Sequence, residues 1–90
     1  MTEIQLDIVH FLFRNRKLSN SRTYKKEAMA KIIKMKYPDA NFEKELRGLI
    51  NKKWVGVANK QGREALYTTH KIKNYLIEHG YQVERVVSID

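Results

Sequence analysis

The chain has 90 residues, of which 18 are Lys or Arg and 10 are Asp or Glu, so its formal charge is +8. It contains no cysteine, which excludes disulfides and cysteine-based zinc sites, and no apolar run approaches the ~20 residues of a membrane span. We therefore expect one domain over residues 1–90 in a reducing cytoplasm, no membrane association and a polyanionic partner.

The positive charge is concentrated in one segment. Residues 14–36 contain nine basic residues and one acidic residue, a net charge of +8, whereas residues 1–13 carry −2 and residues 37–90 carry +2. The segment also contains apolar residues at helical spacing, so we expect it to fold with its charge on a surface rather than to form a disordered basic tail.

The first predicted helix follows Thr2, a suitable N-cap, and ends near Arg16. It carries two apolar stripes; the first consists of Ile4, Ile8, Phe11 and Leu12. The second consists of Leu6, Val9 and Phe13. A second exposed apolar stripe predicts a homodimer interface. The alternative is that a C-terminal segment of the same chain covers it.

The second predicted helix begins at Ser21 or Thr23 and ends near Lys36, because the residue before Pro38 is steered away from helical geometry. Its expected buried side consists of Tyr24, Ala28, Ile32 and Met35. The polar connection before it leaves room for a short strand near Leu18.

The third predicted helix spans about Asp39–Lys53, with Asp39 or Asn41 as its N-cap. One face is apolar and consists of Phe42, Leu46, Leu49 and Ile50. The other face has no acidic residue and consists of Lys44, Arg47, Gly48 and Asn51. Two helices joined by so short a turn can form a helix-turn-helix, whose second helix enters the major groove.

A β-hairpin is predicted next, with strands at 54–58 and 63–68. Between them, residues 59–62 suit a type I turn that closes with a left-handed Gly62. A fourth helix, 70–79, is expected to be capped by Thr69 and stopped by Gly80. Residues 81–90 are interpreted as an extended arm that packs on the first helix or on a second subunit.

Two short motifs resemble the MarR-type winged helix-turn-helix proteins. The first is Leu46, Leu49, Lys53, Trp54 and Val55, although Lys53 stands where that family often has Gly; the second is the run 66–69, Leu-Tyr-Thr-Thr. The resemblance implies an α+β, mainly α, winged-helix domain of three helices, a two-stranded wing, a fourth helix and an arm. Small proteins of this type are frequent in archaea and their viruses, and a viral origin would place this one in a host cytoplasm.

The resemblance also implies a transcriptional regulator, often a homodimer, that binds double-stranded DNA through helix 39–53 in the major groove and wing 54–68 near the minor groove. The expected base-reading residues are Asn41, Lys44, Arg47, Gly48 and Asn51. The expected phosphate contacts are Arg22, Lys25, Lys26, Lys31 and Lys52. The expected wing contacts are Lys60, Gln61 and Arg63. For Gly48, the alternative to close DNA contact is tight packing against the second helix.

The sequence does not favour an enzyme, a metal site or a cofactor. His10, His70 and His79 lack metal-ligand spacing, and there is no glycine-rich phosphate loop. Two other classes remain as alternatives. One is a winged-helix protein-interaction or adaptor module. The other is a binder of RNA or single strands.

Overall fold

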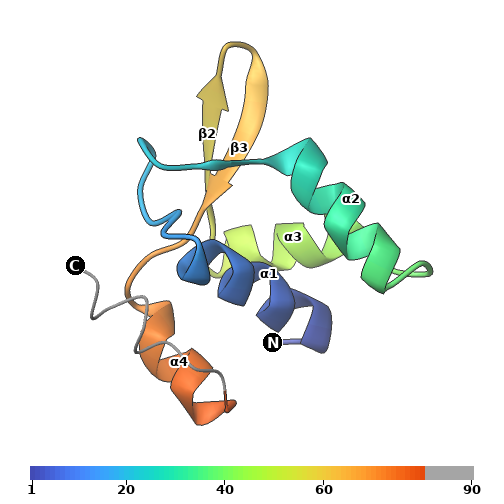
Figure 1. Ribbon diagram of the computed structural model, residues 1–90, viewed down its shortest axis with the longest axis vertical. Coiled ribbons are helices and arrows are strands. Elements are labelled where there is room, and N and C mark those ends of the chain that lie inside the picture. The colour runs from blue at the N-terminus through green and yellow to red at the C-terminus, as the bar shows by residue number, and fades with distance from the viewer. Residues whose placement is uncertain (81–90) are drawn as a thin grey trace.

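The computed structural model describes residues 1–80, which form four helices and one three-stranded antiparallel sheet (Figure 1). The expected α+β class is confirmed. The elements in chain order are α1 (Glu3–Arg14), β1 (Tyr24–Lys25), α2 (Lys26–Lys36), α3 (Phe42–Asn51), β2 (Gly56–Lys60), β3 (Arg63–Tyr67) and α4 (Ile72–Glu78). The expected arm at 81–90 lies outside the described residues.

Helix α1 begins as predicted. The Thr2 hydroxyl accepts a hydrogen bond from the amide of Gln5 at 3.1 Å, and the Gln5 side-chain oxygen accepts one from the amide of Thr2 at 3.0 Å. This reciprocal capping box satisfies two amides that the first turn would otherwise leave unpaired. The helix ends two residues earlier than expected, at Arg14.

The prediction that the second stripe of α1 is exposed is wrong. Val9 and Phe13 have no exposed surface, and Leu6 is half-buried against the same core. Helix α4 packs on α1 and contributes the buried residues Ile72 and Leu76 to this core (Figure 1). The alternative, cover by a C-terminal segment of the same chain, is therefore correct, and these side chains are unavailable to a second subunit.

Helix α2 begins later than expected, because the preceding residues form strand β1. Tyr24 pairs with Leu66 of β3, and its ring packs edge-on against Phe11 with centroids 4.9 Å apart. Near Leu18, where a strand was expected, the only pairing is the single bridge between Ser19 and Arg22.

The buried face of α2 differs from the predicted one by about one residue. Met29 and Ile33 enter the core, whereas Met35, which was expected to be buried, is 85% exposed. Lys26 and Ala30 border a hollow beside the hairpin, and Met29 and Ile33 are the residues of α2 that face the core.

Strands β2 and β3 form the expected hairpin, and β3 lies in the middle of the order β1-β3-β2. The turn differs from the prediction. Lys60 pairs with Arg63, which leaves a two-residue loop, and both Gln61 and Gly62 have positive φ angles, 55° and 80°. Positive angles at both positions define a type I′ turn, whose twist matches that of the two strands, rather than a type I turn.

Helix α3 is shorter than predicted but has one of the two expected caps, because the Asn41 side chain accepts from the amide of Lys44 at 3.2 Å. At its other end Lys53 has a φ angle of 64°. The amides of Lys53 and Trp54 donate to the carbonyls of Ile50 and Leu49, both at 3.0 Å. This is a Schellman ending, in which the left-handed position usually holds glycine.

Lys53→Gly is expected to raise the free energy of unfolding by about 0.5–1 kcal/mol, because a side chain in the left-handed region is strained and glycine is not. Urea denaturation measures the change. The matched control is Lys52→Gly, which removes the same charge at a neighbouring position where φ is −90°. A gain of equal size in both variants would contradict strain at Lys53 as the cause.

Helix α4 is also shorter than expected. Thr69 is not its cap, since the N-cap position is Lys71 and the Thr69 hydroxyl is buried without a hydrogen-bond partner. Gly80 has a φ angle of 82° just beyond the helix, as expected of a helix stop.

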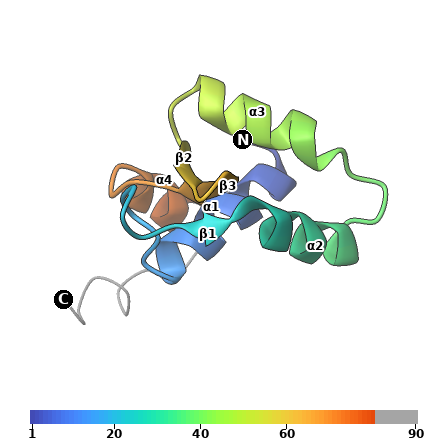
Figure 2. The ribbon, with the colours of Figure 1, turned by 90° about the horizontal axis from the view of Figure 1, so that it is seen from above.

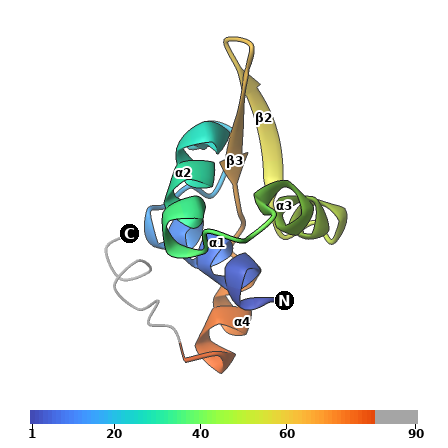
Figure 3. The same ribbon diagram turned by 90° about the vertical axis from the view of Figure 1, so that its right-hand side faces the viewer.

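The hairpin projects away from the helices, and α3 lies beside its base (Figure 3). Seen along the hairpin, α3 lies on one side of the molecule and α1 and α2 on the other (Figure 2). One long side of α3 therefore faces outward.

Candidate nucleic-acid interface

Three of the predicted base-reading residues share the outward side of α3. Lys44, Arg47 and Asn51 are exposed and follow one another at intervals of three and four residues. The opposite side of the helix enters the core through Leu46 and Leu49. We call Lys44, Arg47 and Asn51 the α3 stripe; it offers two cations and one amide from a rigid helix.

Asn41 does not belong to the α3 stripe, contrary to prediction. Its side-chain oxygen is engaged in capping the helix. An asparagine that reads adenine uses its oxygen and its nitrogen together, so Asn41 would have to release the cap or share its oxygen between the cap and the base.

Gly48 does not face outward either. A Cβ atom at this position would lie 2.7 Å from the side-chain nitrogen of Gln5 on α1. That nitrogen donates to the main-chain oxygen of Glu45 at 3.1 Å. Gly48 therefore leaves room for the Gln5 side chain to reach the main chain of α3. The packing alternative is correct in kind, although the neighbour is the first helix rather than the second.

The two acidic residues of α3 are directed toward neighbouring elements. The Glu43 carboxylate lies 3.0 Å from the ammonium group of Lys26, and the Glu45 carboxylate accepts from the Thr2 hydroxyl at 3.4 Å. Glu43 precedes Arg47 by one turn and its side chain is 61% exposed, so it borders the stripe, but its carboxylate is paired with Lys26.

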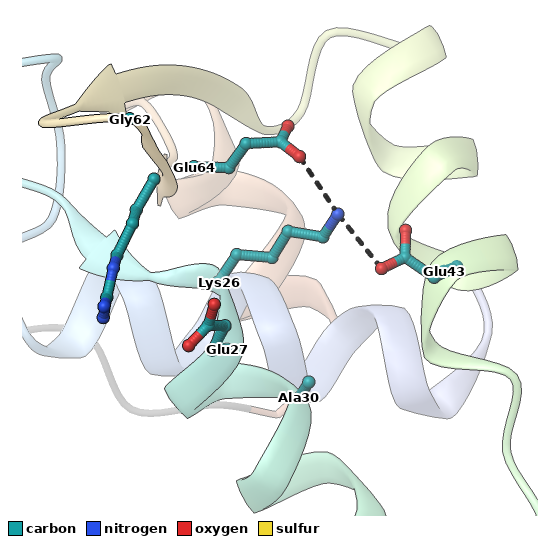
Figure 4. A pocket seen from close by; sticks show the side chains of 7 residues that line it. Lys26, Glu27, Ala30, Glu43, Gly62 and Glu64 are labelled. Carbon is teal, nitrogen blue, oxygen red and sulfur yellow. Dashed lines mark hydrogen bonds and ion pairs between the residues drawn. The ribbon is translucent and has the colours of Figure 1, made fainter.

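Lys26 joins three elements and does not suit the predicted phosphate contact. Its ammonium group lies between Glu43 of α3 and Glu64 of β3, the second at 3.3 Å (Figure 4). The hydrogen bond to Glu43, with a smaller contribution from Glu64, raises the pKa of Lys26. We call these three residues the Lys26 junction.

The hollow around the Lys26 junction, with a volume of about 320 Å³, is unfavourable for phosphate. Glu27 and Arg63 also line it, so three carboxylates and two cations border the hollow, and the carboxylates of Glu43 and Glu64 point toward Lys26 (Figure 4). A phosphate group that approached Lys26 would have to displace a carboxylate and would be repelled by the others.

Lys26→Met is expected to lower the free energy of unfolding by about 1 kcal/mol, because it leaves two carboxylates side by side without their partly exposed counter-ion. The salt dependence of duplex binding should stay the same, since the ammonium group of Lys26 is already paired with Glu43 and Glu64. Lys52→Met, the matched control, should reduce the salt slope by about one. A slope that falls equally in both variants would restore Lys26 as a phosphate contact.

The other predicted phosphate contacts are exposed but do not lie together. Lys52 follows the α3 stripe directly, at the C-cap of the helix. Lys31 lies on the side of α2 away from its buried residues. Lys25 borders the same hollow as all three predicted wing residues, Lys60, Gln61 and Arg63, and Arg22 precedes β1.

Two contributors to this surface were not predicted. Gln5 fixes the approach of α1 to α3, and its role in the capping box was readable from the Thr-x-x-Gln spacing. Glu64 belongs to the Lys26 junction, and no local pattern indicates it, because 37 residues of chain separate it from its partner.

No protein-family model, no curated protein and no solved structure matches the chain. Of the helices in residues 1–80, none has the length and apolar character needed to cross a membrane.

Proposed function

We propose that the protein is a sequence-specific double-stranded DNA-binding transcriptional regulator that reads the major groove with the α3 stripe. The observation that carries this proposal is the composition of the outward side of α3, where Lys44, Arg47 and Asn51 stand without an acid among them. Arginine and lysine can reach guanine acceptors, and asparagine can pair with adenine.

The order and arrangement of the elements support the proposal. Helices α2 and α3 are joined by the short segment 37–41, and the projecting hairpin follows α3 directly (Figure 3). This is the arrangement expected of a winged helix-turn-helix, in which the second helix of the pair enters the groove and the hairpin forms the wing. Lys60 and Gln61 stand exposed at the hairpin end.

The geometry of α3 suits a major groove. Its ten residues span about 15 Å at ~1.5 Å per residue, which fits within one segment of a groove about 12 Å wide. Lys52 at its end can then neutralise a phosphate at the groove edge.

Selection of bound duplexes from a random pool tests the proposal. Enrichment of a short consensus supports it, and a two-fold-symmetric consensus would add a homodimer that does not use the buried stripe of α1. If single strands compete equally with the duplex, the protein is instead a binder of RNA or single strands. If it binds no nucleic acid at low salt, it is instead a protein-interaction module.

A further inference from the structure

The three-stranded sheet places one cation from each strand around a single hollow. Lys25 of β1, Lys60 of β2 and Arg63 of β3 line a hollow of about 340 Å³, together with Gln61 and Ala65. We call Lys25, Lys60 and Arg63 the cationic sheet face.

The pairing register places these residues on one side of the sheet. Lys60 stands opposite Arg63, and Lys25 stands opposite Ala65, which is two residues beyond Arg63 on β3. Residues two apart in a strand point to the same side. Adjacent strands are about 4.8 Å apart, so the stem of Lys25 rises beside the small, buried Ala65 and the stem of Lys60 rises beside Arg63.

The opposite side of the sheet is turned to the helices. Glu64 and Leu66 alternate with Arg63 and Ala65 along β3; Leu66 is fully buried in the core, and Glu64 belongs to the Lys26 junction with α2 and α3. Glu64 also borders the hollow of the cationic sheet face, but its carboxylate is bound to Lys26. The cationic sheet face thus looks away from α3.

The charges of this face are not compensated within residues 1–80. No carboxylate of this part of the chain forms an ion pair with Lys25, Lys60 or Arg63. Like charges directly opposite each other in a hairpin destabilise it, and Lys60 and Arg63 form such a pair. An anion held between the strands would offset this repulsion.

We propose that the cationic sheet face is a phosphate-binding site separate from the α3 stripe. A phosphate group in the hollow beside the buried Ala65 would accept hydrogen bonds from the ammonium groups of Lys25 and Lys60. Arg63, at the end of β3, borders the acidic hollow as well and therefore contributes less. The phosphate can come from a DNA backbone outside the segment that α3 reads, or from a small phosphorylated molecule.

Titration of the protein with inorganic pyrophosphate, followed by amide NMR, tests the site without DNA. Saturable shifts are expected at residues 25, 60 and 61, and binding should be about tenfold weaker in the double variant Lys25→Gln/Lys60→Gln. The control is Lys34→Gln/Lys71→Gln, which removes the same charge from exposed positions in α2 and at the N-cap of α4, outside the sheet and the α3 stripe. Equal weakening in both double variants, or shifts spread over all basic residues, would overturn the proposal.

A second titration with a short duplex identifies the source of the phosphate. A salt slope reduced by about two in Lys25→Gln/Lys60→Gln, but not in Lys34→Gln/Lys71→Gln, would assign the site to a DNA backbone. An unchanged slope with lost pyrophosphate binding would assign it to a small molecule. If the wild type binds pyrophosphate at this face but binds no duplex, the proposed function fails and the phosphate site stands.

Discussion

Phe13→Ala is expected to lower the free energy of unfolding by about 3–5 kcal/mol. The ring has no exposed surface and belongs to the core that joins α1 to α4, so its removal leaves a cavity that the surrounding helices can fill only in part. The free energy of unfolding of a domain is only about 5–15 kcal/mol, so the loss is a large fraction of the total. Urea denaturation measures it, and Phe13→Leu provides a milder variant should the alanine protein fail to fold.

Leu6→Ala is the matched control, because Leu6 is on the same stripe of α1 but only half-buried. It should lower the free energy of unfolding clearly less than Phe13→Ala does. Sedimentation at several concentrations completes the experiment. Were Phe13 part of a subunit interface, its replacement would abolish self-association and leave the stability of the single chain nearly unchanged. That result would contradict the conclusion that α4 of the same chain covers the second apolar stripe of α1.

Arg47→Ala is expected to weaken binding to the preferred duplex by about 1–3 kcal/mol and to leave nonspecific binding much closer to that of the wild type. Arg47 is the central residue of the α3 stripe, and a guanidinium group can donate two parallel hydrogen bonds to guanine. Competition between the selected duplex and a scrambled duplex at fixed salt measures the two losses separately.

Arg47→Lys provides the sharper control for base reading, since it keeps the charge and loses the planar fork. We expect it to recover most of the nonspecific affinity and little of the preference for the selected site. Arg22→Ala removes a charge from an exposed position before β1 and should leave the preference intact. Equal losses for both duplexes in Arg47→Ala would make Arg47 a phosphate contact only.

The α3 stripe depends on two supports that lie outside the stripe itself. Glu43 is held toward Lys26, and Glu45 lies toward Thr2, so neither carboxylate joins the stripe. Gly48 lets Gln5 reach the backbone of α3 and thereby ties the helix to α1. The outward side of α3 is therefore basic because its neighbours take up its acids.

The features that the sequence alone determined are those that depend on contacts within a few residues. The Thr2 and Asn41 caps, the outward grouping of Lys44, Arg47 and Asn51, and the Gly80 stop all follow from local hydrogen bonds or from the period of one helix. The hairpin was predicted by the same local signals. Its turn type was not, because the exact register, with Lys60 opposite Arg63, decides the loop length.

Only the tertiary structure decided the features that join distant segments. Tyr24 is in a strand rather than in α2 because Leu66 offers it a partner, and Phe13 is buried because α4 returns to cover it. Lys26 meets Glu64 and Gly48 meets Gln5 only after the elements pack. Helical periodicity predicts which residues of a segment share a face; which element covers that face, and which charges then neutralise one another, depends on long-range packing that no local pattern contains.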